Sequence, residues 1–114
     1  LLAAELAADL PDAVVCYDDR LALELMDALR ACGLRVPDDV SIVGFDGIPF
    51  AAISNPRLTT VAVPSAELGR KAAIMLLRAV HEGTLPEGEV LPVEIAIRDS
   101  TRRSNGADGP GVRG

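Results

Sequence analysis

The sequence predicts an α/β fold in which a parallel β-sheet carries helices on its faces. Short apolar runs bounded by Pro, Gly and Asp alternate along the chain with longer segments whose apolar residues recur at helical spacing. The chain is 49% hydrophobic but only 3% aromatic, so the core is expected to consist of small aliphatic side chains between helices and sheet. Its 114 residues suit one domain, or one part of a larger domain.

The first half of the chain predicts two helices and two strands. Residues 1–9 resemble the middle of a helix, which favours a chain that begins inside a longer protein, and a Pro-Asp pair ends them. Residues 13–17 form an apolar run typical of a fully buried strand. Residues 19–32 carry an apolar helical stripe, and Gly33 follows where helices commonly end. After a turn, residues 40–45 form a second buried strand.

The second half predicts two further strands with a long helix between them. After an irregular stretch, residues 58–63 are rich in β-branched side chains and predict the third strand. Ser65 is placed to cap the long helix, which ends at Gly83. A weakly alternating fourth strand is expected at about residues 90–97.

Composition excludes several classes of function. The net charge is −6 and the only lysine is Lys71, so this chain is a poor electrostatic match for nucleic acid. Cys16 and Cys32 have neither CxxC spacing nor a Cys/His cluster nearby, which predicts reduced thiols packed in the core of a cytoplasmic protein and no bound metal. No run of eighteen apolar residues is present to span a membrane, and the start lacks the basic region of a signal peptide.

Carboxylates follow the first two predicted strands at the point where each ends. Asp18 and Asp19 close the first strand, and Asp46 closes the second within the stretch SIVGFDGIPF. Ligands of open α/β sheets bind outside the carboxyl ends of the strands, so these acids are candidates for ligand contact. One acid of the first pair can cap the following helix, and Asp46 can be a turn residue because Asp-Gly favours tight turns. Either Asp19 or Asp18 can be that cap, which leaves the other acid of the pair, together with Asp46, as a candidate for ligand contact.

Two kinds of chemistry suit carboxylates at this edge. Paired carboxylates could hold Mg²⁺ and accept a phosphoryl group, but that reaction needs a nearby lysine, and Lys71 lies in the middle of a helix. Alternatively, they could accept hydrogen bonds from a neutral polyol such as a sugar, which needs no metal, cofactor or lysine. No nucleophile elbow or phosphate-binding glycine loop is present, and the single histidine, His81, ends a helix. The sequence therefore favours ligand binding without catalysis.

Three segments resemble the C-terminal end of the lactose-repressor/galactose-repressor (LacI/GalR) family of bacterial transcription regulators. They are VVCYDDRLALELMDALRACGLRVPDDVSIVGFDGIPFA, NPRLTTVAVPSAELGRKAAIMLL and LPVEIAIRDST. The resemblance implies one lobe, incomplete, of a type I periplasmic binding protein-like fold. It also implies a cytoplasmic, non-enzymatic regulator whose effector, a small molecule such as a sugar, binds between two lobes and controls operator binding. Operator DNA would then be bound through an N-terminal region outside this chain. A secreted sugar-binding protein of a transport system, and a phosphoryl-accepting domain or phosphatase, are the alternatives.

The resemblance also carries individual residues. Family members usually present Asn-Asp after the first strand and contact the effector through the first of the two, which here is Asp18, an acid in place of the amide. Asp46 matches the aspartate of the family's GFD or GYD motif, which typically contacts the effector. The resemblance therefore assigns effector contact to Asp18 and Asp46, which leaves Asp19 for the helix cap. Val63 stands where several members have a polar residue.

The domain organisation that follows is simple. Residues 1–101 are expected to be the C-terminal part of the effector-binding domain, within which residues 63–88 cross to an N-terminal lobe. Residues 102–114, which contain Gly, Pro and Arg and have nothing to bury, are expected to form a disordered tail.

The helix at 19–32 indicates a partner surface. Its apolar stripe is widened sideways by Ala22, Leu23 and Met26, beyond the arc that a core-facing helix needs. Another segment of the same chain could cover these side chains. The resemblance favours a homodimer instead, because family members pair through this lobe. Leu23 and Met26 are therefore assigned to a dimer interface, with Ile53 as a weaker candidate for the same surface.

Overall fold

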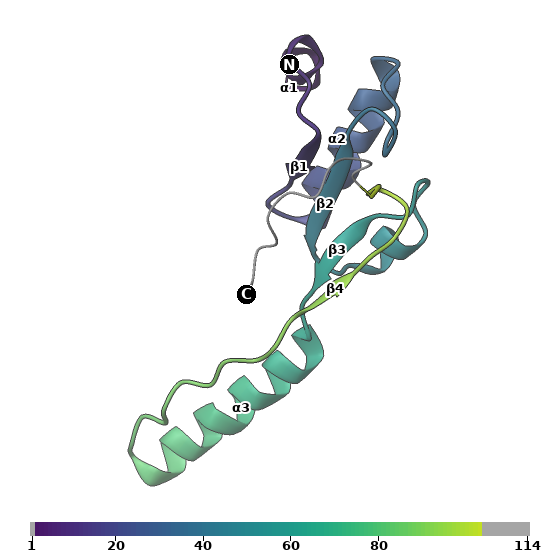
Figure 1. The fold of residues 1–114 in the computed structure, drawn as a ribbon. Helices are drawn as coiled ribbons and strands as arrows, with labels where there is room; N and C mark the ends of the chain where they lie inside the picture. The colour runs from purple at the N-terminus through teal and green to yellow at the C-terminus, as the bar shows by residue number, and fades with distance from the viewer. Residues whose placement is uncertain (1, 104–114) are drawn as a thin grey trace, which may run out of the picture.

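The elements alternate between helix and strand as the sequence predicts. The computed structural model describes residues 2–103, so most of the predicted tail lies outside the described residues. The elements are α1 (Leu2–Ala8), β1 (Ala13–Val15), α2 (Asp19–Ala31), β2 (Ser41–Asp46), the short 3-10 helix η1 (Pro49–Ala52), β3 (Thr59–Ala62), α3 (Ser65–Glu82) and β4 (Glu94–Ala96). The strands are shorter than predicted at most ends, and the four strands and three α-helices are all confirmed (Figure 1).

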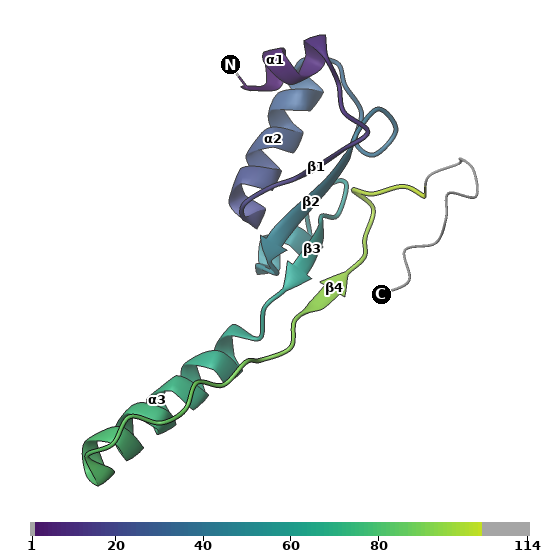
Figure 2. The ribbon, with the colours of Figure 1, turned by 60° about the vertical axis from the view of Figure 1, so that its left-hand side comes forward.

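The four strands form one sheet in the order β1-β2-β3-β4. The first three are parallel, as predicted, and β4 runs antiparallel to β3. The direction of β4 follows from α3, which extends away from the sheet instead of packing back across it (Figures 1 and 2). The chain after α3 runs back along that helix, so it re-enters the sheet from the end at which β3 leaves it (Figure 2).

The core lies between α2 and one face of the sheet. Leu25 and Leu29 of α2 are buried against Ile42 of β2, with Val40 and Leu58 closing the layer. Burial of these aliphatic side chains stabilises the fold by roughly 1.5–3 kcal/mol for each large one. The opposite face of the sheet is open among the described residues, where side chains such as Val15 and Ile95 are exposed. The predicted helix cover is therefore present on one face only.

Helix α3 extends from the rest of the molecule and buries none of its residues (Figure 1). Its apolar stripe remains in solvent, with Leu76, Leu77 and Val80 more than half exposed. It ends at Gly83, as predicted, which takes a left-handed φ of 70°. The predicted cap at its start is wrong. Pro64 is the N-cap residue, because Ser65 is already the first residue of the helix. The Ser65 hydroxyl donates to the Val63 carbonyl at 3.4 Å and caps no helical N–H group.

The two cysteines differ in burial, which corrects the prediction that both are packed in the core. Cys16, which directly follows β1 in the chain, is buried, and Cys32 is exposed. Cys32 is the residue at which α2 ends, and its backbone N–H bonds back to the helix. At that position the side chain has left the buried stripe. Gly33 follows with φ 79°, as expected for a residue just past a helix end.

Residues 98–101 fasten the returning chain to the amino ends of β2 and β3. The buried Ser100 hydroxyl donates to the Ile42 carbonyl at 2.6 Å and accepts from the Thr59 N–H at 2.8 Å. Its carbonyl accepts from the Ile42 N–H at 2.8 Å. Ser100 thereby satisfies backbone groups that the sheet would otherwise leave unpaired in its interior.

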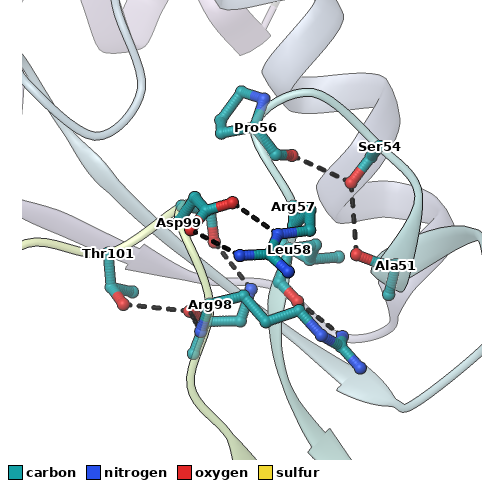
Figure 3. Close-up of polar contacts among 10 residues, drawn as sticks. Ala51, Ser54, Pro56, Arg57, Leu58, Arg98, Asp99 and Thr101 are labelled. Carbon is teal, nitrogen blue, oxygen red and sulfur yellow. Dashed lines mark hydrogen bonds and ion pairs between the residues drawn. The ribbon is translucent and has the colours of Figure 1, made fainter.

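Exposed polar contacts surround this attachment (Figure 3). The Arg57 guanidinium donates to both oxygens of Asp99, at 2.7 and 3.2 Å. Arg98 donates to the Leu58 carbonyl at 2.8 Å. Residues 98–101 therefore close the amino end of the sheet, and the carboxyl end is the candidate place for a ligand.

Candidate ligand site at the carboxyl edge of the sheet

Asp46 occupies the end of β2 in a strained backbone conformation. Its φ is 105°, and Gly47 follows at 75°. A side chain at position 47 would have its Cβ 2.9 Å from the Ala62 Cα, so only glycine fits. The Asp46 carbonyl accepts a hydrogen bond from the Val63 N–H at 3.2 Å, and the residue itself is exposed. Strain of this kind in a non-glycine residue concentrates at functional sites.

Asp18 is the N-cap of α2, and the predicted cap at Asp19 is wrong. The Asp18 backbone is extended, with φ −145° and ψ 172°, and its Oδ1 accepts from the Leu21 N–H at 2.7 Å. The helix starts at Asp19, so the cap falls on the residue before it. Only one carboxylate oxygen is used in the cap. Burial and the nearby Asp18 charge, in that order, raise the pKa of the Cys16 thiol.

Asp19 is fully buried and joins three segments at this edge. Its Oδ1 accepts from the Thr60 hydroxyl at 2.5 Å, and its Oδ2 accepts from the Ile48 N–H at 2.8 Å. The first turn of α2 also favours a negative charge. This role of Asp19 was not predicted from the sequence. Gly44, in the middle of a buried β-strand, is the local signal of the close approach.

Two hollows meet at Asp46. One has a volume of about 620 Å³ and lies between residues 46–49 and residues 63–67, at the start of α3. The other, of about 400 Å³, is lined by Tyr17, Phe45 and Asp46. Both volumes lie within the usual range for small-molecule sites. Asp18 lines neither hollow, but it directly follows Tyr17 in the chain. Asp46 therefore lines both hollows, and Asp18 follows the neighbouring parallel strand β1 at the same end of the sheet.

A separate groove follows the side of α2. It has a volume of about 450 Å³ and runs between α2 and residues 54–56, with Leu23 and Met26 in its lining. Leu23 is half-buried, Ile53 is 75% exposed and Met26 is only 7% exposed. Met26 therefore packs into the core of this chain, which corrects the inference that it extends beyond the core-facing arc. Met26 nevertheless also lines the groove.

Lys71, the lysine that phosphoryl transfer would require, lies in α3 and forms ion pairs with Glu67 and Glu89. In the part of the chain that the structure describes, no three side chains of His, Cys, Asp and Glu are placed to hold a metal ion. Within the same part, no helix has the length and apolarity that a membrane crossing requires. The carboxyl edge around Asp46 is therefore the candidate site.

Comparison with known proteins places the chain among bacterial regulators. A family model described as a periplasmic binding protein-like domain matches residues 1–101. The arabinose metabolism transcriptional repressor of Geobacillus stearothermophilus is 42% identical over 94 residues, which cover 81% of this chain and 26% of that protein. The HTH-type transcriptional repressor CytR of Escherichia coli is 40% identical over 93 residues, which cover 81% of this chain and 27% of that protein. The chain thus spans about a quarter of the length of these relatives.

Solved structures give the same result. A LacI family transcriptional regulator from Enterococcus faecalis V583, with bound ribose, has a TM-score of 0.82 and 31% identity, over 87% of this chain and 38% of that chain. A LacI family regulator from Arthrobacter sp. FB24, in complex with lactose, has a TM-score of 0.77 and 30% identity, over 88% of this chain and 38% of that chain. The predicted fold class is confirmed, with β4 as the antiparallel exception. The chain belongs to the periplasmic binding protein-like family, as part of the effector-binding domain of the LacI/GalR transcriptional regulators.

Proposed function

We propose that this chain is the effector-sensing portion of a LacI-type DNA-binding regulator, and that it binds a sugar in a cleft between two lobes. The observation that carries the proposal is Asp46, an exposed carboxylate held at a strained φ of 105° beside the hollow of about 620 Å³. Both curated relatives described above are transcriptional repressors. They favour this function over a secreted transport protein, and over an enzyme.

The chemistry of the edge suits a polyol. Ionised carboxylates only accept hydrogen bonds, and sugar hydroxyls donate them. Asp46 would accept from the effector with its full carboxylate, and Asp18 with the oxygen that the cap leaves unused. The exposed Tyr17 ring beside Asp46 supplies an apolar surface for the face of a sugar ring. The ribose and lactose bound to two of the similar structures are in keeping with this ligand class.

The proposed mechanism is a shift between two lobe arrangements. Residues 63–88 cross to a second lobe, and the exposed apolar stripe of α3 supports a packing partner there. The hollow of about 620 Å³ lies between the turn at residues 46–49 and the first turn of α3. An effector bound there would contact this lobe and the start of the crossover at the same time. An effector that binds one arrangement more tightly shifts the population toward it. Operator DNA would respond through a region outside this chain.

We place a homodimer contact on the groove beside α2. Leu23 and Met26 line this groove, and the exposed Ile53 directly precedes residues 54–56 of its lining. This groove is separate from the hollows at Asp46. Effector and partner copy would therefore bind different faces of the same cytoplasmic protein.

The test is Asp46→Ala in the full-length regulator, with operator binding measured by fluorescence anisotropy while a panel of sugars is added. Operator affinity without sugar should match the wild type, because Asp46 is exposed and lies outside the core. Release or strengthening of operator binding by sugar should be lost. Asp12→Ala, another exposed acid on a strand-flanking turn, is the matched control and should respond normally. A normal sugar response in Asp46→Ala would refute the assignment.

A further inference from the structure

The buried carboxylate of Asp19 connects three separate segments of the chain. Asp19 begins α2, Thr60 lies in β3, and Ile48 lies in the loop after β2. Among the side chains that the structure describes, no lysine or arginine forms an ion pair with Asp19. A buried carboxylate without a cation depends on its hydrogen bonds, so the donors from Thr60 and Ile48 are both needed.

The neighbouring strand is adapted to this carboxylate. Gly44 of β2 lies opposite Thr60 of β3 in the sheet. A Cβ at position 44 would lie 2.1 Å from Asp19 Oδ1 and 3.2 Å from Asp19 Cα. The Asp19 carboxylate therefore occupies the space that a side chain at position 44 would need. Three residues from different elements are matched to one another here.

This carboxylate holds the turn that presents Asp46. The turn has two consecutive positive φ values, at Asp46 and Gly47. It is fixed on one side by the Val63 N–H, which donates to the Asp46 carbonyl, and on the other by the Ile48 N–H, which donates to Asp19. Strained backbone persists only where surrounding contacts over-determine it. Without the Asp19 contact, one of these two anchors is lost.

We infer that Asp19, supported by Thr60 and Gly44, is a positioning residue for the effector site. It does not touch the effector. Through its hydrogen bond from the Ile48 N–H, Asp19 fixes the direction of the Asp46 carboxylate. Through its peptide bond to Asp18, it fixes the position of the second acid. The inference rests on the proposed effector role of Asp46 and Asp18. It explains why an acid is buried one residue after the helix cap, where capping needs only one.

The experiment compares four variants of the full-length regulator. Thr60→Val removes the donor to Asp19 while keeping the side-chain shape, and Thr60→Ser restores the hydroxyl. Asp19→Asn keeps the shape but puts an N–H group where one of the donors points. Ser100→Ala is the control, because it removes a buried hydroxyl with two hydrogen bonds, to Ile42 and Thr59 at the amino ends of β2 and β3, and none to Asp19 or to residues 46–50.

Two quantities are measured for each variant: the Kd for D-ribose and lactose by titration calorimetry, and hydrogen–deuterium exchange of peptides that cover residues 46–50. Thr60→Val and Asp19→Asn should raise the sugar Kd by about tenfold or more and accelerate exchange in these peptides. Thr60→Ser should restore both quantities. Ser100→Ala, although the loss of two buried hydrogen bonds destabilises the fold, should leave the Kd and the exchange of residues 46–50 unchanged.

The two measurements separate the positioning role from the proposed function. Equal weakening of sugar binding in Thr60→Val and Ser100→Ala would overturn the inference, since general destabilisation would then explain it. A wild-type protein that binds neither sugar would count against a sugar of this kind as effector. Exchange would still decide the positioning role, and unchanged exchange of residues 46–50 in Asp19→Asn would overturn it.

Discussion

Gly44→Ala should be among the most damaging single-methyl additions in this chain. The new Cβ would lie 2.1 Å from Asp19 Oδ1, 3.0 Å from Leu58 Cδ2 and 3.2 Å from Asp19 Cα. An ordinary C···O contact needs more than about 3.3 Å. The carboxylate must therefore move by about 1 Å or more, with backbone on one side and a buried leucine on the other.

That displacement breaks the contacts that the carboxylate makes. The two hydrogen bonds to Asp19, at 2.5 and 2.8 Å, would lengthen past the useful limit of about 3.2 Å. Overpacking costs about 1–3 kcal/mol and each buried group left without a partner a further 1–3 kcal/mol. Gly44→Ala should therefore lower the free energy of unfolding by about 3–5 kcal/mol, a large share of the stability of an ordinary domain.

The assay is urea unfolding of the full-length regulator, followed by circular dichroism at 222 nm. Gly69→Ala is the matched control, because no atom lies within 4 Å of its Cβ position, and alanine is favoured over glycine within a helix by about 1 kcal/mol. In an Asp19→Ala background the Oδ1 clash is absent, so Gly44→Ala should cost less there. The reasoning is refuted if Gly44→Ala costs less than about 0.5 kcal/mol, or costs the same in both backgrounds.

Three further outcomes are expected. The Arg57 guanidinium, through its hydrogen bonds, lowers the pKa of Asp99 in the folded protein. The ion pair therefore contributes its full stability at pH values above the pKa of Asp99 in the unfolded chain, about 4. That stability is lost as the pH falls through the lower pKa of Asp99 in the folded protein. Asp99→Asn should accordingly be less stable than the wild type at neutral pH, and the difference in urea midpoint should vanish near pH ~2 and shrink in high salt. Cys32 should react quickly with a thiol reagent such as DTNB at pH ~8, whereas Cys16, whose pKa is raised by burial and by Asp18, should react slowly; a fast phase that survives in Cys32→Ser would contradict the burial described. Asp46→Gly should raise the free energy of unfolding by about 1 kcal/mol, since glycine accepts the positive φ without strain, while the sugar response is lost; a decrease in stability would show that φ is not strained.

The sequence by itself determined the elements whose signals are local. The helical stripe of 19–32 and its following glycine predict α2 almost to the residue, and Gly83 ends α3 where expected. The acid that ends the second strand predicts Asp46 at the carboxyl edge, which the structure confirms. These features depend on side-chain periodicity and on backbone freedom at single residues, and both can be read within a few positions of the chain.

Other features needed contacts between distant residues. Alternation of apolar side chains carries no strand direction, so the antiparallel pairing of β4 with β3 followed only from the path of α3. Asp18 and Asp19 have identical side chains, and a register difference of one residue decided which of them caps the helix. Cys32 lies one position beyond the last residue of α2, where it is exposed.

The role of Asp19 was decided by tertiary structure alone. Its two donors lie 41 and 29 residues away, in β3 and in the loop after β2, and its space comes from Gly44 within β2. A buried carboxylate is stable only where such partners converge. That convergence is a property of the assembled sheet edge, because Asp19, Thr60 and the stretch that holds Gly44 and Ile48 lie far apart in the chain.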